Sequence, residues 1–255
     1  MDYPTFKKAA GELTGINLSS YKSQQMDRRI NSLMQLWNLT SYDQFWEVLR
    51  TNPSKYRDFV KKLTINVSEF FRNPERFYEL WQNILPRLLA KPQLNIWSAG
   101  CSDGAEPYSI AIILQELKFK NRVKIIATDV DKIILEKALE AIYGLNEVKS
   151  LPPELLEKYF ETRDNLYFLK DSTKQMVEFR AHNLFVDQYE DHLDLIICRN
   201  VVIYFTEEAK KILYQKFFEA LNPGGYLMVG GTEPLLTYRQ LGFDNPLTSF
   251  YRKPE

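Results

Sequence analysis

Apolar residues in the first 64 positions recur three or four residues apart, as they do on one face of an α-helix. Gly15, the turn at 38–41 and Asn52-Pro53 interrupt this pattern. It predicts four short helices, carrying Phe6, Ala10 and Leu13; Met26, Ile30, Leu33, Met34 and Trp37; Tyr42, Phe45, Trp46 and Leu49; and Tyr56, Phe59, Val60 and Leu63. A unit of about 60 residues buries little surface alone, so we expect it to pack against the rest of the chain.

Further along the chain, continuous apolar runs alternate with amphipathic stretches. This alternation is typical of a parallel sheet with helices on both faces. We therefore predict a doubly wound α/β domain behind an all-helical N-terminal domain. The expected strands are 94–99, 122–129, 193–200 and 224–231, and the expected helices are 106–119, 131–143 and 206–221.

Two glycines follow the first predicted strand, in the stretch SAGCSDGAEPYSIA (98–111). Ligands of doubly wound sheets bind at this strand-to-helix turn, so Gly100 and Gly104 are expected to let the backbone approach a ligand. The spacing is not Gly-x-Gly-x-x-Gly, which disfavours a dinucleotide and hence a dehydrogenase. Glu106 opens the following helix with a carboxylate, where a nucleotide phosphate would otherwise dock.

Asp129 ends the second predicted strand, where an acidic residue typically accepts hydrogen bonds from ribose hydroxyls. Asp at a strand end also serves as a turn or helix-cap residue, but Asp131 is the better candidate for that cap. The glycine turn, Glu106 and Asp129 together favour S-adenosylmethionine, a nucleoside that carries a sulfonium in place of phosphates.

Composition narrows the remaining chemistry. The chain of 255 residues has two cysteines and two histidines, too few for a disulfide framework, and we expect no metal site. It lacks an apolar run of the roughly 18 residues needed to span a membrane and a signal-peptide core, so a cytoplasmic location is expected. Residues 1–72 carry 11 Lys and Arg against 7 Asp and Glu, which makes this part the better candidate for an acidic partner.

Five stretches in order carry a resemblance to a known family: TINVSEFFR (64–72), GCSDGAEPYSIA (100–111), ATDVD (127–131), HNLF (182–185) and CRNVVIYF (198–205). The chain resembles the CheR family of chemotaxis-receptor glutamate methyltransferases over essentially its whole length. The resemblance implies a helical domain (1–64), a linker that contributes to the cofactor site (65–75) and a Rossmann-like methyltransferase domain (76–255). It also implies methyl transfer from S-adenosylmethionine to receptor glutamates, giving γ-glutamyl methyl esters and S-adenosylhomocysteine.

The resemblance also implies site residues, while residue type alone leaves alternatives open. Asn66 and Ser68 fit caps in a linker equally well, Arg72 fits a surface ion pair, and Tyr204 fits the core. The implied cofactor-binding residues are Asn66, Ser68, Arg72, Gly100, Gly104, Glu106, Asp129, Asn183, Leu184, Arg199 and Asn200, and Arg72 and Tyr204 would orient the acceptor.

The family also carries a small antiparallel β-subdomain, expected here at about 150–181 from the resemblance. NLYFL (165–169) and QMVEFR (175–180) read as a hairpin across KDSTK. Some members bind a receptor C-terminal pentapeptide on this subdomain. Here only the four residues ETRD separate KYF from NLYFL, a shorter connection than in those members, so we expect no such tether. Another departure is VGGTEP (229–234), which keeps Glu233 but lacks the histidine of the family's Gly-His-Ser-Glu.

A glutamate acceptor, with a pKa near ~4.3, is already ionised at neutral pH and needs no general base. The partner implied is the cytoplasmic helical bundle of methyl-accepting chemotaxis receptors; we expect a monomer that binds no nucleic acid and does not insert into membranes. Two other functions stay open: a CheR-like methyltransferase of another signalling system, and a non-catalytic adapter that binds S-adenosylmethionine.

Overall fold

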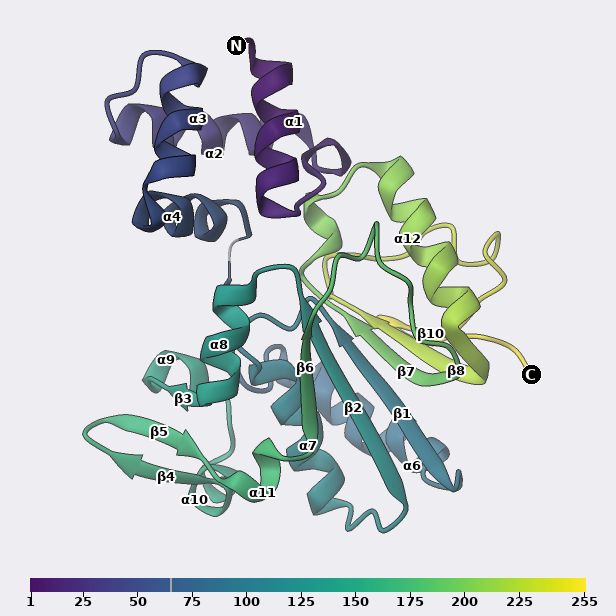
Figure 1. Cartoon of the computed structure of the whole chain (residues 1–255). Coiled ribbons are helices and arrows are strands. Elements are labelled where there is room, and N and C mark those ends of the chain that lie inside the picture. Colours follow the sequence, from purple (N-terminus) through teal and green to yellow (C-terminus); the bar gives the residue numbers. More distant parts are fainter. Residues whose placement is uncertain (65) are drawn as a thin grey trace.

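The computed structural model describes residues 1–64 and 66–255, and it places a helical domain next to an α/β domain (Figure 1). Ile65, the first residue of the predicted linker 65–75, lies outside the described residues. The helical domain contains α1 (Tyr3–Thr14), the 3-10 helix η1 (Leu18–Ser20), α2 (Ser23–Leu36), α3 (Tyr42–Thr51) and α4 (Pro53–Thr64). The four predicted helices are confirmed.

Aromatic rings form the core of the helical domain. The side chains of Phe6, Phe45 and Phe59 are fully buried, with ring centroids 4.9 Å apart for Phe6 and Phe45 and 5.5 Å apart for Phe45 and Phe59. Val130, which follows a strand of the α/β domain, packs against the same core. The small helical unit therefore gains burial from the rest of the chain, as its size predicted.

Within the described residues, seven strands form the large sheet, in the order β6-β2-β1-β7-β8-β10-β9. β6, β2, β1, β7 and β8 run parallel, whereas β10 and β9 are antiparallel to their neighbours. The strands are β1 (Gln93–Ala99), β2 (Arg122–Asp129), β6 (Val177–Ala181), β7 (Leu193–Cys198), β8 (Leu221–Val229), β9 (Asp244–Leu247) and β10 (Phe250–Arg252). The sheet confirms the predicted α/β class and includes the four predicted strands.

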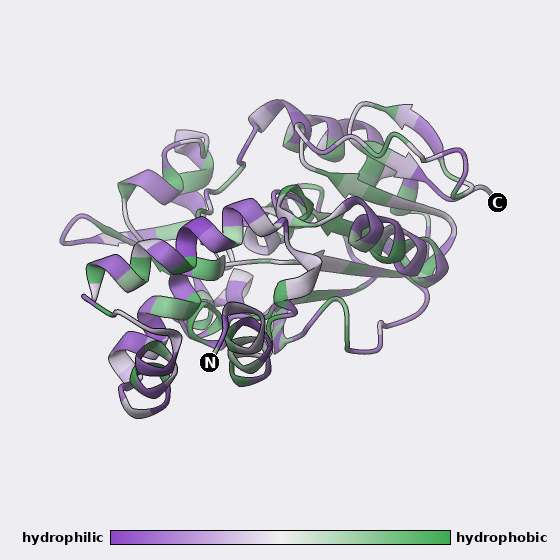
Figure 2. Ribbon diagram, turned by 90° about the horizontal axis from the view of Figure 1, so that it is seen from above, coloured by the Kyte–Doolittle hydropathy of each residue, from purple (hydrophilic) through white to green (hydrophobic). Residues whose placement is uncertain are grey.

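Helices cover both faces of this sheet, and neighbouring residues of β1 point into different cores. Ile96 lies in the core beneath α5, α6 and α7, and Trp97 lies in the core beneath α12. Figure 2 shows green, hydrophobic stretches in the central strands, whereas the helices alternate between green and purple along their length. The helices are α5 (Pro74–Glu79), the π-helix η2 (Leu80–Ile84), α6 (Leu85–Leu88), α7 (Ala105–Glu116), α8 (Lys132–Glu140) and α12 (Glu207–Ala220). In the described parts of the chain, we find no helix with the length and apolar character of a membrane span.

A second, smaller sheet differs from the predicted hairpin. β3 (Ile142–Tyr143), β5 (Leu166–Leu169) and β4 (Phe160–Arg163) pair antiparallel, and the residues joining β4 to β5, Asp164 and Asn165, have φ of 49° and 61°, typical of a type I′ turn. The predicted pairing of NLYFL with QMVEFR is wrong: β6 instead joins the large sheet beside β2. The segments between these strands form α9 (Leu145–Val148), α10 (Pro153–Tyr159) and α11 (Asp171–Lys174).

The position of β6 follows from the side chain of Phe179. Its ring packs edge-on against Tyr108 of α7, with the centroids 5.4 Å apart. This contact lies on a covered face of the large sheet, which offers β6 more apolar burial than a two-stranded hairpin could.

Candidate functional site

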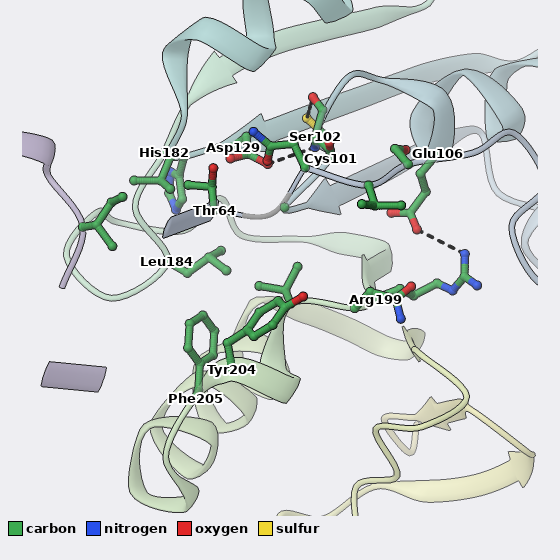
Figure 3. A pocket seen from close by; sticks show the side chains of 18 of the residues that line it. Thr64, Cys101, Ser102, Glu106, Asp129, His182, Leu184, Arg199, Tyr204 and Phe205 are labelled. Atoms are coloured by element: carbon green, nitrogen blue, oxygen red, sulfur yellow. Dashed lines mark hydrogen bonds and ion pairs between the residues drawn. The ribbon is translucent and has the colours of Figure 1, made fainter. Parts of the chain in front are cut away.

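A pocket lies at the carboxyl ends of β1, β2 and β7, where the helical domain and the linker meet the sheet (Figure 3). Its empty volume is about 1000 Å³, including the solvent at its mouth. The structure brings together every predicted site residue except Gly104: Asn66, Ser68, Arg72, Gly100, Glu106, Asp129, Asn183, Leu184, Arg199, Asn200 and Tyr204 line the pocket.

The two glycines of the first turn have different surroundings. Gly100 lines the pocket with φ of 82°, and a Cβ atom there would lie 2.4 Å from Cγ2 of Val201. Gly104 is the N-cap of α7, with φ of 86°, and its absent Cβ would meet Tyr108 at 3.0 Å. Gly100 therefore shapes the pocket wall, whereas Gly104 lets α7 begin and pack.

Asp129 is a buried carboxylate at the end of β2. Its Oδ2 accepts a hydrogen bond from the backbone N–H of Ser102 at 2.9 Å, and its Oδ1 accepts one from Asp131 N–H at 3.0 Å. Burial raises the pKa of Asp129 to about 6, although these N–H donors act in the opposite direction. Asp131 caps α8 by accepting from Ile133 N–H, as predicted, which leaves Asp129 directed to the pocket.

Glu106 and Arg199 form an ion pair in the pocket wall. The distance from Nη1 of Arg199 to Oε2 of Glu106 is 3.3 Å, and Ser98 donates to the other carboxylate oxygen at 2.8 Å. Burial raises the pKa of Glu106, opposed by Arg199 and Ser98. Nη2 of Arg199 donates to Oδ1 of Asn73 at 2.8 Å and to the carbonyl of Arg72 at 2.7 Å. With its side chain only 1% exposed, Arg199 joins the linker to the sheet.

Thr64 and Asn66 tie the start of the linker to the sheet domain, and Arg72 bonds within the linker. Asn66 donates from Nδ2 to Oδ2 of Asp131 at 2.8 Å, and Thr64 donates from Oγ1 to the same oxygen at 3.2 Å. Arg72 donates from Nη1 to the carbonyl of Val67 at 2.9 Å. The helix cap Asp131 thus also fixes the start of the linker beside the pocket.

Asn183 and Tyr204 connect the pocket to the helical domain. Asn183 donates from Nδ2 to the carbonyl of Gly15 at 2.5 Å and accepts at Oδ1 from the N–H of Phe185 at 2.9 Å. The guanidinium of Arg29, on α2, lies 4.8 Å from the centroid of the Tyr204 ring. The side chain of Asn183 is therefore used within the fold, and Tyr204 is held between the two domains.

Sequence reasoning missed Ile16, Asn17 and Tyr21, which line the pocket from the helical domain together with Thr64 at the end of α4. Tyr21 forms an isolated antiparallel bridge with Phe205, where Lys22 N–H donates to the carbonyl of Tyr204 at 2.8 Å. The Tyr21 and Phe205 rings meet edge-on at 5.0 Å. No local motif marks these residues, because only the packing of one domain on the other brings them to the site.

The polar groups of this pocket suit a nucleoside with a positive charge. An ionised carboxylate oxygen has more than one acceptor site, so Asp129 can accept from ribose hydroxyls in addition to its two backbone partners. Figure 3 shows Leu184 and His182 near Asp129, with Glu106 and Arg199 at the other side of the drawn site. The donor and acceptor set therefore fits S-adenosylmethionine better than a pyrophosphate, for which two carboxylates are unfavourable neighbours.

Both domains match known families. Residues 1–64 match "CheR methyltransferase, all-alpha domain", and residues 66–245 match "CheR methyltransferase, SAM binding domain". The chain belongs to the CheR methyltransferase family. Its cofactor is accordingly S-adenosylmethionine, in agreement with the carboxylates of Asp129 and Glu106 in the pocket wall.

Curated relatives of this CheR protein match over both domains. A chemotaxis protein methyltransferase of Listeria monocytogenes is 36% identical over 99% of this chain and 97% of its own length. Another, from Borreliella burgdorferi, is 34% identical over 94% of this chain and 89% of its own length. Among solved structures, the S-adenosylmethionine-dependent methyltransferase SibL covers 70% of this chain and 56% of its own, at 15% identity and a TM-score of 0.38, too partial a likeness to support a conclusion.

Proposed function

We propose that this protein methylates glutamate side chains of methyl-accepting chemotaxis receptors, forming γ-glutamyl methyl esters on their cytoplasmic helical bundles. The observation that carries this proposal is the similarity to chemotaxis protein methyltransferases, which extends through the helical domain as well as the sheet domain. A shared cofactor domain alone would support only methyl transfer. The helical domain both lines the pocket and lies outside the cofactor-binding fold, so it is the natural part to present a protein acceptor.

S-adenosylmethionine supplies a methyl group on a sulfonium, which is already activated toward a nucleophile. The protein then has to bind, orient and exclude water, because a glutamate carboxylate is ionised at neutral pH and needs no base. We propose that Asp129 accepts hydrogen bonds from the ribose hydroxyls, and that Asn66, Ser68, Gly100, Asn183, Leu184 and Asn200 form the surrounding wall. Glu106 and Arg199 fix the opposite wall through their ion pair.

Arg72 and Tyr204 would orient the acceptor carboxylate. Arg72 lines the pocket and uses one of its five N–H donors on Val67. Tyr204 presents a hydroxyl from a ring that Arg29 covers at 4.8 Å. The guanidinium groups of Arg72 and Arg29 and the phenol of Tyr204 favour the approach of an anionic acceptor. They would orient the acceptor carboxylate without a tight ion pair, so the carboxylate stays nucleophilic.

The receptor partner is proposed from charge. Residues 1–72 hold 11 basic against 7 acidic residues, so association with an acidic helical bundle should weaken as salt rises. We further propose that a monomer performs the reaction and that the receptor tail is not used, because β4 and β5 are only four residues each and joined by a tight turn. Calorimetry with a receptor tail peptide tests the last point, which saturable binding would overturn.

The proposed function is tested with methyl-tritiated S-adenosylmethionine and membranes carrying single chemoreceptors. Base treatment of the washed membranes should release labelled methanol, since carboxyl esters are base-labile. At low cofactor concentration Asp129→Asn should release much less label, and Asp191→Asn, a change at an exposed carboxylate of the same domain, should keep it. Cofactor binding without any base-labile label would contradict the proposal and favour either another acceptor or a non-catalytic adapter.

A further inference from the structure

Glu233 is a buried carboxylate that lies outside the pocket lining but contacts the segment that forms its wall. Glu233 is only 5% exposed to solvent. Oε2 accepts from the backbone N–H of Asn200 at 2.6 Å and of Gly230 at 3.0 Å, and Oε1 accepts from the N–H of Ile203 at 3.1 Å. Three backbone donors from two segments thus converge on one carboxylate.

The turn that carries Glu233 is itself fixed. The N–H of Glu233 donates to the carbonyl of Gly230 at 3.0 Å, and the next residue but one, Leu235, donates to the hydroxyl of the buried Tyr251 at 2.8 Å. A Cβ atom on Gly230 would lie 2.1 Å from Oε2 of Glu233. Glycine at 230 therefore leaves room for the carboxylate, which explains why Gly230 and Glu233 occur together in VGGTEP.

The segment held by Glu233 needs such support. Asn200 has φ of 59°, a left-handed conformation that asparagine adopts more readily than most residues other than glycine. The 3-10 helix η3 (Val202–Tyr204) follows it at once. Asn200, Val201 and Tyr204 all line the pocket, so a shift of this short segment moves three of the groups that meet the ligands.

We propose that Glu233 is a positioning residue for methyl transfer: its carboxylate fixes the backbone of 200–203 and thereby places Asn200 and Tyr204 against the cofactor and the acceptor. The side chain of Glu233 does not line the pocket. It contacts the backbone of Asn200 and Ile203, so it acts only through the wall segment that it holds. The part that concerns the acceptor rests on the proposed function, whereas the part that concerns the cofactor does not.

The test is calorimetric binding of S-adenosylhomocysteine, which requires no acceptor and so is independent of the receptor assignment. Glu233→Gln keeps the size of the side chain but turns an amide NH₂ toward backbone donors. Gly230→Ala keeps the charge but places a methyl group where Oε2 lies. Glu219→Gln, at an exposed glutamate of α12 in the same domain, is the matched control.

We expect Glu233→Gln and Gly230→Ala each to raise the dissociation constant about tenfold or more, with a binding stoichiometry near one, and Glu219→Gln to leave it unchanged. A residue that supports only folding would lower the stoichiometry or the melting temperature and leave the dissociation constant of the folded fraction as it was. That result in either variant would overturn the proposal. If Glu233→Gln fails to fold, Gly230→Ala decides by the same criterion.

Discussion

From the ionisation of Asp129 we predict that replacing this residue lowers cofactor affinity without lowering the free energy of unfolding. Burial raises its pKa from 3.8 to about 6, a shift worth about 3 kcal/mol. Between pH 3.8 and about 6, the folded chain therefore holds a proton on Asp129 that the unfolded chain has already released. The stability from this proton is fully present below pH 3.8, and it is lost as the pH rises through about 6. At neutral pH the fold carries an anion whose burial is costly.

Asp129→Asn removes that cost together with one acceptor. The amide keeps one oxygen for the N–H of Ser102 or of Asp131 and turns NH₂ toward the other, which costs about 1–3 kcal/mol. The two effects nearly offset, so the free energy of unfolding at neutral pH should not fall appreciably. Cofactor affinity should nevertheless fall about tenfold to a hundredfold, because the ribose hydroxyls lose a charged acceptor.

The assay combines urea unfolding with calorimetric titration of S-adenosylhomocysteine between pH 5 and pH 8. For the unmodified protein, we expect the dissociation constant to be constant above about pH 7 and to rise as Asp129 takes up its proton near pH 6. The variant should bind weakly at every pH. A variant with unchanged affinity, or an unmodified protein with no pH dependence in this range, would refute the role given to Asp129.

Three further changes test other parts of the site. Arg199→Met should lower the free energy of unfolding by about 3–5 kcal/mol in urea titrations, because Glu106, whose side chain is only 14% exposed, loses its partner. A loss below ~1 kcal/mol would contradict the pair's structural role. Gly100→Ala should unfold at a clearly lower temperature than Gly15→Ala in calorimetric scans, since both have positive φ but only the first side chain would collide with its surroundings; equal melting temperatures would count against this. Arg72→Ala should lower turnover with little effect on melting temperature, and unaltered turnover in the methanol-release assay would remove its proposed role in orienting the acceptor.

The strands and helices that carry the cofactor turn could be predicted from the sequence, because apolar runs and caps are local signals. Asp131 illustrates this, since its predicted cap is present on α8. The pairing of β6 could not be predicted in the same way. Val177 and Phe179 alternate equally well in a hairpin and at a sheet edge, and only the contact of Phe179 with α7 decides between them.

The candidate site, too, could be predicted only in part from the sequence. The sequence does not distinguish the roles of Gly100 and Gly104. Only Gly100 lines the pocket, because Gly104 is enclosed by Tyr108, Phe179 and Ala138. Tyr21 reaches the site through the docking of the helical domain, and Glu233 contacts its wall through the backbone N–H groups of Asn200 and Ile203. Such contacts join residues far apart in the chain, where no spacing rule applies.

The most direct test of the proposed reaction is mass-spectrometric mapping of a receptor cytoplasmic fragment after incubation with the protein and S-adenosylmethionine. The account predicts methyl esters confined to glutamate side chains of the helical bundle and strongly reduced with Asp129→Asn. Methylation confined to another residue type, or none at all from protein that binds the cofactor, would contradict it.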